Sequence, residues 1–574
     1  MNYNKGREKL NIILVSYSGY PEINSTWLHY DNGLALLGGS LIEKDYNVKI
    51  FDFQRLDVWE ELFPHDYEEE YFQLKDEAEK YFNIAFAVKQ AGAKSKYEGE
   101  KIIDKCLIFD EKVDIHNRKV INKLVEQIFI VCENFEPDII GFKLWGQNSQ
   151  PDQFYMAGLL RNKYKNALLI GGGPSVEIYQ EHIFYETSVF DILIHGPGEE
   201  TIQQIAEFKE GKRELGDITN VIYQDKEELV KRSRIFPNLD KVSPYNYDED
   251  VYLFSKYKLH NVHVESSRGC NFGCEFCVHP QKSGKLLLKS SDLFVEDVIR
   301  LNRKYGFSYF HLADSNPPLK HLASISKILY QKKLHYGFMC FQSLRSINEQ
   351  DLKWLKKGNF NWFWIGVESG SDEVLEDLSK KQETKKVKEC FELLNKYDIL
   401  TTASIIVPSP HENNKTIMST IEHLKVLKPD TVLPFAPVVQ PQTKWFQSDR
   451  VLVKDKDAVI RSMIRCGMEW HTGNKILPMV FHDNLFEQEI KYSGKSYKEV
   501  FFSYKYYEQM IRNALSGQIA MNKFRKIKKI NSGFMDVYLQ SQIEIAQAIR
   551  SAQFDNAKKI LSAFNESAHL REFF

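Results

Sequence analysis

Short apolar runs, each ended by a polar residue or glycine, recur along the first 235 residues. Runs of strand length lie at 11–17, 47–53, 138–145, 167–171 and 191–196. Segments with helical spacing of apolar residues, such as 33–43 and 197–208, lie between them. This alternation predicts a parallel, doubly wound sheet of α/β class, whose ligand site lies at the carboxyl ends of its strands.

The segment 54–135 interrupts the alternation. It is rich in charged residues, has a helical pattern, and is too long for a simple crossover connection. We therefore expect an inserted helical lid or partner surface within a first domain at residues 1–235. A linker is predicted at 236–258.

A second alternating series follows the linker. Candidate strands lie at 262–266, 307–313, 336–342, 363–367, 401–407 and 431–435, and candidate helices at 291–305, 350–357 and 384–397. Six strand–helix units predict a closed or partial β/α barrel at 259–450, with its chemistry at the carboxyl ends of the strands. Residues 451–574 have a mainly helical pattern, which predicts a helical C-terminal domain.

Length and charge narrow the classes of protein that fit. A chain of 574 residues needs more than one hydrophobic core, and none of its apolar runs approaches the roughly 20 residues of a membrane span. With 76 basic and 78 acidic residues, the net charge of −2 disfavours a nucleic-acid binder. The N-terminus lacks the apolar run and cleavage site of a signal peptide, so we expect a cytoplasmic protein.

Three of the eight cysteines are close together, in the sequence SSRGCNFGCEFCVHP. Cys270, Cys274 and Cys277 directly follow the first strand of the second series. Thiolates are the ligands of iron–sulfur clusters, and this spacing allows one loop to surround a cluster. Three thiolates leave one iron of a four-iron cluster open to another ligand. Gly269 and Gly273 are expected to let the loop turn tightly.

Zinc is the alternative for this loop. Structural zinc takes four ligands, and His279 would complete a set of three cysteines and one histidine. The position of the loop, directly after a strand that opens a barrel series, favours the iron–sulfur cluster.

The cysteine spacing, with Phe276 before the last cysteine, resembles the signature of the radical S-adenosylmethionine (SAM) superfamily. The resemblance implies a [4Fe-4S] cluster on Cys270, Cys274 and Cys277. It also implies SAM, whose amino and carboxylate groups chelate the fourth iron and whose adenine lies against Phe276. Reduction by an external electron donor such as flavodoxin or ferredoxin would then produce a 5′-deoxyadenosyl radical.

Polar residues after later strands agree with this resemblance. The sequence ADSN at 313–316 ends the second strand, GVESGS at 366–371 resembles the fourth-strand stretch of the family, and TASIIVP at 402–408 resembles its fifth-strand segment. The resemblance implies catalytic roles for Asp314 and Glu368, and contacts to SAM from Ser315, Asn316, Glu368, Ser369 and Ser404. Two structural alternatives stay open: Glu368 pairs with a lysine, or Asp314 caps the helix that begins near 317–319.

The first domain resembles the cobalamin-binding domain that precedes the barrel in cobalamin-dependent radical enzymes. The motifs are, in order, GLALLGGS (33–40), VKIFD (48–52), PDIIG (137–141), IGGGP (170–174) and HGPGEE (195–200). The resemblance implies cobalamin contacts at Gly171, Gly172, Gly173, Pro174, Gly196, Gly198 and Glu199. Each glycine cluster alone is also typical of a tight turn. SYSGYP (16–21) replaces the Asp-x-His-x-x-Gly stretch of other cobalamin proteins, so we expect cobalamin without histidine ligation.

Together the resemblances predict an enzyme that methylates an unactivated carbon, or phosphorus, of a small molecule or peptide. A cobalamin-dependent cyclisation, ring contraction or rearrangement is the alternative, and a non-catalytic cobalamin or redox sensor is a second one. Methylthio transfer to transfer RNA would need a second cluster near the N-terminus, which Cys106 and Cys132 do not provide.

Overall fold

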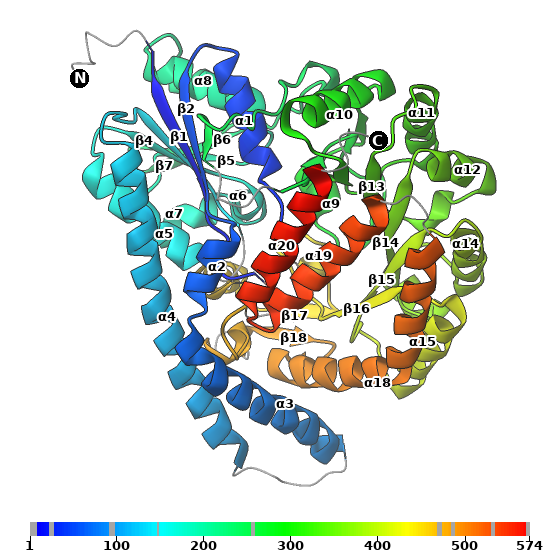
Figure 1. The fold of residues 1–574 in the computed structure, drawn as a ribbon. Coiled ribbons are helices and arrows are strands. Elements are labelled where there is room, and N and C mark those ends of the chain that lie inside the picture. The colour runs from blue at the N-terminus through cyan, green and yellow to red at the C-terminus, as the bar shows by residue number, and fades with distance from the viewer. Residues whose placement is uncertain are drawn as a thin grey trace.

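The computed structural model describes residues 9–21, 28–90, 98–145, 149–253, 259–467, 473–483, 488–529 and 534–569. Two α/β units, one at the N-terminus and one in the middle of the chain, lie side by side (Figure 1). The C-terminal helices lie across both units, and the helices α3 and α4 extend away from them. The expected α/β class with parallel sheets and a mainly helical C-terminal region is confirmed.

The first sheet has eight strands in the order β7-β6-β5-β4-β3-β1-β2-β8. They are β1 (Asn11–Ser16), β2 (Asn47–Asp52), β3 (Ile139–Lys143), β4 (Leu168–Gly172), β5 (Ile192–Ile194), β6 (Val221–Asp225), β7 (Glu228–Lys231) and β8 (Tyr252–Leu253). Strands β1 to β5 and β8 run parallel, and their central members are fully buried apolar runs, as helix-covered parallel strands require. The strand order reverses between β1 and β3, which places a ligand crevice at their carboxyl ends.

Helices cover this sheet. They are α1 (Asn32–Ile42), α5 (Gln150–Lys163), α6 (Pro174–Tyr179), α7 (Ile183–Glu186) and α8 (Glu199–Lys209). In α1, Gly39 allows close packing, since a side chain there would overlap the backbone carbonyl of Pro244. The antiparallel β6–β7 hairpin was not predicted from the sequence.

The segment between β2 and β3 consists of α2 (Leu56–Leu62), α3 (Glu68–Gln90) and α4 (Glu98–Val131). Asp110 on α4 is buried, and its carboxylate accepts the backbone N–H groups of Ile476 at 2.7 Å and Leu477 at 3.0 Å. The helical segment is therefore attached to the C-terminal region of the chain.

The second sheet has six parallel strands in the order β16-β15-β14-β13-β12-β9. They are β9 (Asn261–Val264), β12 (Tyr309–Leu312), β13 (Gly337–Gln342), β14 (Phe360–Glu368), β15 (Leu400–Ile406) and β16 (Thr431–Phe435). The covering helices are α10 (Ser291–Tyr305), α11 (Leu319–Gln331), α12 (Glu349–Lys357), α13 (Asp372–Asp377), α14 (Thr384–Lys396) and α15 (Asn414–Leu427). Because β9 and β16 are not paired with each other, the barrel is partial.

The first domain contacts the open β9 edge of the barrel. Tyr30, in the loop between β1 and α1, forms a parallel β-bridge with Val262 of β9. The neighbouring His29 ring lies 4.0 Å from the ring of His263, also on β9. The two units therefore share backbone pairing at the point where the barrel is open.

The C-terminal region is mainly helical, with α16 (Lys456–Cys466), α18 (Tyr497–Lys529), α19 (Phe534–Arg550) and α20 (Phe554–His569). It also contains a small antiparallel sheet, β17 (Val451–Val453), β18 (Ile490–Tyr492) and β19 (Lys495–Ser496), which the sequence pattern did not predict. Within the described ranges, none of the helices is both long and apolar enough to cross a membrane.

Candidate active site

The three bunched cysteines lie in the loop between β10 (Ser267–Arg268) and α9 (His279–Ser283). Cys270, Cys274 and Cys277 are partly exposed and line one cavity of about 730 Å³ at the mouth of the barrel. Gly269 has a φ of +91°, and a side chain there would overlap the carbonyl oxygen of Lys285. Glycine is thus required directly before Cys270. The matching prediction for Gly273 is wrong, since its φ is not positive.

The loop geometry suits a multi-iron cluster better than zinc. Zinc bound at about 2.3 Å would hold its sulfur ligands about 3.8 Å apart, whereas each cysteine of a four-iron cluster binds a different iron. Among the described residues, no three His, Cys, Asp or Glu side chains converge as a single metal ion would require. His279, the fourth ligand in the zinc alternative, has its Nδ1 3.1 Å from Oγ of Ser315. Burial raises the pKa of the free Cys277 thiol to about 11, and a bound metal would displace that proton.

Phe276 lines the same cavity. Its ring centroid lies 5.8 Å from that of Trp445, and Nζ of Lys380 lies 5.7 Å from the Phe276 centroid. An aromatic face is therefore held beside the cysteines by two neighbours. Its contact with adenine stays a prediction.

Asp314 follows β12 and is fully buried beside the cavity. Its carboxylate accepts the backbone N–H of Ser266 at 2.9 Å and the hydroxyls of Ser266 and Ser267, the latter at 2.9 Å. The helix-cap alternative is wrong, because α11 begins after Pro318 without a side-chain cap. Burial raises the pKa of Asp314 to about 7, against the hydrogen bonds from the two serines. The carboxyl group thus fixes the segment that leads to Cys270.

Glu368 ends β14 with a φ of +63° and lines the cavity. Its Oε1 lies 2.7 Å from Nζ of Lys380, and both side chains are buried. The lysine pairing that the sequence left open is confirmed. The pair packs over Gly366, where a side chain would overlap both charged groups.

The remaining predicted SAM contacts divide into two groups. Ser315, Asn316 and Ser404 line the cysteine cavity, and Oδ1 of Asn316 also accepts the backbone N–H of Ser343 at 2.8 Å. Ser369 does not line it: its hydroxyl lies 3.1 Å from Oγ1 of Thr420 on α15. Whether any of them contacts SAM stays a prediction.

A second cavity, of about 300 Å³, lies between the carboxyl ends of the first sheet and the barrel mouth. Six of the seven residues predicted to contact cobalamin line it. They are Glu199 and the residues of two glycine-rich turns, Gly172, Gly173, Pro174, Gly196 and Gly198. Gly173 has a φ of +92°, so the turn itself requires glycine. Gly171 lies elsewhere, packed in the sheet against Leu193 and Leu144.

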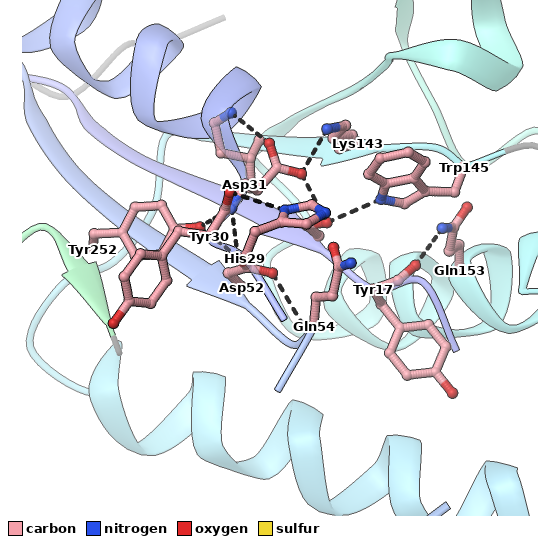
Figure 2. Close-up of polar contacts among 12 residues, drawn as sticks. Tyr17, His29, Tyr30, Asp31, Asp52, Gln54, Lys143, Trp145, Gln153 and Tyr252 are labelled. Atoms are coloured by element: carbon pink, nitrogen blue, oxygen red, sulfur yellow. Dashed lines mark hydrogen bonds and ion pairs between the residues drawn. The ribbon is translucent and has the colours of Figure 1, made fainter. Parts of the chain in front are cut away.

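Polar side chains that the sequence reading missed gather at the β1–β3 crevice (Figure 2). Nζ of Lys143 lies 2.6 Å from Oδ2 of Asp31, and Oδ1 of the same carboxylate accepts the N–H of Leu34 and so caps α1. Nζ of Lys143 also lies 4.0 Å from the ring of Trp145, whose Nε1 donates to Ser16. Lys143 lines the second cavity, whereas Trp145 lines the cysteine cavity. The crevice therefore reaches both cavities.

Two further groups lie in or beside this crevice. Burial and the neighbouring Asp31 raise the pKa of Asp52 to about 6, although Tyr252 donates to its carboxylate. His29 lies in the loop between β1 and α1. Its ring lies against that of His263 at an angle of 53°, and His29 is not among the residues that line the second cavity.

Glu199 gives this second cavity an unused acceptor. Its Oε1 accepts Nη2 of Arg268 at 2.6 Å, and Arg268 also pairs with Glu265. The Glu199 side chain is buried, and its Oε2 has no hydrogen-bond partner among the described residues. A corrinoid carries amide N–H donors around a broad ring, so glycine surfaces and an orphan acceptor fit that group.

The two cavities meet. Five residues line both of them: Pro174, His279, Lys282, Ala313 and Ser315. Groups bound at the glycine turns and at the cysteine loop would therefore face a common space. Burial lowers the pKa of His279 to about 4, so the histidine at this junction is neutral at pH 7.

Residues 264–424 match the Radical SAM superfamily. The chain contains a radical SAM domain. This match spans the cysteine loop and the barrel strands β12 to β15, and it confirms the family expected from the cysteine spacing. It also argues against the sensor alternative, since the superfamily consists of enzymes.

Comparison with whole proteins extends the likeness beyond the barrel. The chain is 25% identical over 328 residues to an uncharacterized methyltransferase of Pyrococcus horikoshii, covering 55% of this chain and 71% of that protein. Two solved structures share the fold. One is the radical SAM methyltransferase TsrM of Kitasatospora setae, with cobalamin and a [4Fe-4S] cluster bound (TM-score 0.55, 11% identity, 78% of both chains). The other is the cobalamin-dependent SAM radical enzyme OxsB (TM-score 0.55, 13% identity, 99% of this chain and 72% of that chain).

Proposed function

We propose that this radical SAM enzyme uses cobalamin and methylates an unactivated carbon, or phosphorus, of a small molecule or peptide. The observation that supports the proposal is the junction of the two cavities, one at the cysteine loop and one at the glycine turns. A reduced [4Fe-4S] cluster with SAM supplies a radical that removes hydrogen, and cobalamin supplies a methyl group that a radical accepts. A substrate at the junction would be within reach of both.

Each cofactor has residues to hold it under this proposal. Cys270, Cys274 and Cys277 would hold the cluster, and Phe276, Ser315, Asn316 and Ser404 would contact SAM. Asp314 would act by fixing the Ser266–Ser267 segment, and Glu368 by placing its second carboxylate oxygen in the cavity beside Lys380. The glycine turns and Glu199 would hold cobalamin. These are positioning roles, in which rigid elements fix the reacting groups.

The aromatic side chains of the cysteine cavity would exclude water. Trp364, Phe341 and Phe435 from the barrel and Trp145 from the first domain line it. An enclosed, apolar space protects a radical from side reactions. The electron that starts the reaction would come from an external donor such as flavodoxin or ferredoxin.

A substrate-independent experiment tests the proposal. Protein reconstituted without oxygen should bind about four irons per chain and one hydroxocobalamin. With a reductant and SAM carrying a deuterated methyl group, it should transfer that methyl to the bound corrinoid and release 5′-deoxyadenosine. Binding of the cluster without any corrinoid would refute the methylation proposal. Corrinoid that binds but takes no methyl from SAM would favour the cyclisation and rearrangement alternatives.

A further inference from the structure

Five lysine and arginine side chains line the two joined cavities. Four of them form ion pairs: Lys143 with Asp31 at 2.6 Å, Arg268 with Glu199 at 2.6 Å, Lys282 with Glu177 at 3.2 Å and Lys380 with Glu368 at 2.7 Å. The fifth, Arg345, forms no ion pair with any described residue. Among the described residues, Arg345 is therefore the one cation of the cysteine cavity without a carboxylate partner, and its charge also acts on the Cys270 thiol.

One face of the Arg345 guanidinium group lies against the aromatic ring of Phe272. It follows β13 in a short turn that begins at Ser343, whose hydroxyl accepts the Arg345 backbone N–H at 3.4 Å. The guanidinium carbon lies 4.0 Å from the ring centroid of Phe272, between Cys270 and Cys274. A guanidinium so placed keeps its N–H edges free, because stacking uses only its face.

The unpaired guanidinium is half-buried, and its Nε is buried without a hydrogen-bond partner in the described part of the chain. A buried donor without an acceptor is unfavourable, and a charged one more so. The planar N–H fork matches a carboxylate or phosphate with two parallel hydrogen bonds. An acid group bound here would satisfy both the charge and the donor.

The surroundings of Arg345 indicate what carries that acid group. Phe341, Trp364 and Phe435 line the same cavity from the barrel strands β13, β14 and β16, and Trp145 lines it from the first domain. The acidic side chains of the cavity are already engaged, Asp314 with two serines and Glu368 with Lys380. The space therefore suits an apolar or aromatic body with one acid group.

We propose that Arg345 binds a carboxylate or phosphate of the substrate, so that the substrate is an organic acid with an apolar or aromatic body. The inference rests on the proposed function, since it takes the junction of the cavities as the substrate site. SAM is the other possible source of a carboxylate in this cavity, and the experiment separates the two.

The test compares an acid with its neutral amide. Binding of 3-phenylpropanoate and 3-phenylpropanamide to the full-length reconstituted protein is measured by calorimetry, with SAM affinity measured in parallel. We expect the parental protein to bind the acid at least tenfold more tightly than the amide. Arg345→Gln should abolish this preference, and Arg345→Lys should retain part of it. Lys282→Gln is the matched control, and it should keep the preference because Lys282 is already paired with Glu177.

Three results would overturn the inference. One is a parental protein without preference for the acid, and another is an Arg345→Gln variant that retains the preference and the parental melting temperature. The third is a variant that loses SAM affinity tenfold while its preference for the acid is unchanged, because Arg345 would then serve the SAM carboxylate. The titration requires no turnover, so it decides the inference even if methyl transfer to the corrinoid fails.

Discussion

The Glu368–Lys380 ion pair allows a test of whether Glu368 stabilises the fold, contributes to SAM cleavage, or does both. The two charged groups are 2.7 Å apart, with side chains only 7% and 11% exposed. At an effective dielectric constant of about 20, their attraction is about 6 kcal/mol, much of which offsets the cost of burial. Glu368→Gln leaves the Lys380 charge buried without a partner, which costs about 3–5 kcal/mol. A domain of this size should then melt roughly 6–20 °C lower.

Thermal melting of the protein without cofactors measures this loss, and a double-mutant cycle assigns it. Lys380→Met should destabilise the protein to a similar degree. The double variant Glu368→Gln/Lys380→Met contains no unpaired charge, so we expect a coupling energy of at least about 2 kcal/mol. Glu349→Gln is the control, because Glu349 pairs with Lys396 on the surface, where such pairs are worth less than about 1 kcal/mol.

Formation of 5′-deoxyadenosine by the reconstituted double variant separates the two roles of Glu368. We expect stability to recover while product formation stays at least tenfold below the parental rate, or about 1.4 kcal/mol. A double variant that cleaves SAM at the parental rate would show that Glu368 serves only the fold. A double variant as unstable as the sum of both single variants would refute the ion-pair argument itself.

Four further predictions use the same protein. Cys270→Ala, Cys274→Ala or Cys277→Ala should remove the visible absorption of the cluster, whereas Cys340→Ala, at a buried position in the barrel, should not. Gly269→Ala should lower bound iron to less than half without unfolding the chain, as measured by iron content and circular dichroism. Glu199→Gln should weaken hydroxocobalamin binding about tenfold, because it removes the charge of the orphan acceptor. It also weakens the ion pair with Arg268, but Arg268 keeps its ion pair with Glu265, so the iron content should stay unchanged. The contribution of the buried carboxyls to the free energy of unfolding should fall as the pH rises from about 4 to about 7, because burial raises their pKa values and the unfolded chain loses these protons first. Buried histidines with lowered pKa values, such as His195 and His279, act in the opposite direction. The difference in melting temperature between the parental protein and Asp314→Asn, measured at pH 5 and pH 8, isolates one carboxyl and should change with this sign. The carboxyls are Asp52, at about 6, and Asp152, Asp314 and Glu412, each at about 7.

The eleven strands expected from the sequence all lie in the two parallel sheets, each near its predicted position. Parallel strands covered by helices on both faces must be apolar along their whole length, so each gives a clear signal. The hairpin β6–β7 gave a weaker one, because Glu228–Lys231 is polar and half-exposed. The strands β17 to β19 are only two or three residues long, too short for a periodic pattern.

The residues of the candidate site also differ in how far the sequence alone could predict them. Residues adjacent in sequence, such as Cys270 to Cys277, could be assigned from spacing alone. Residues that the fold brings together could not: Lys380 approaches Glu368 from the segment after α13, and Lys143 approaches Asp31 across 112 residues. Lys143 and Trp145 did lie at the end of a predicted strand, at the edge where doubly wound sheets bind ligands. That rule would have singled them out.

The junction of the two cavities follows from how each sheet ends. A doubly wound sheet binds ligands at the carboxyl ends of its strands, and so does a β/α barrel. The loop that follows the carboxyl end of β1 contains Tyr30, which forms a bridge with Val262 on the open edge of the second sheet. This loop therefore joins the two sheets. This connection brings the two carboxyl edges together and lets Trp145 enter the barrel's cavity. A closed barrel would have no free β9 edge, so the partial barrel is the feature that lets two separate binding sites share one space.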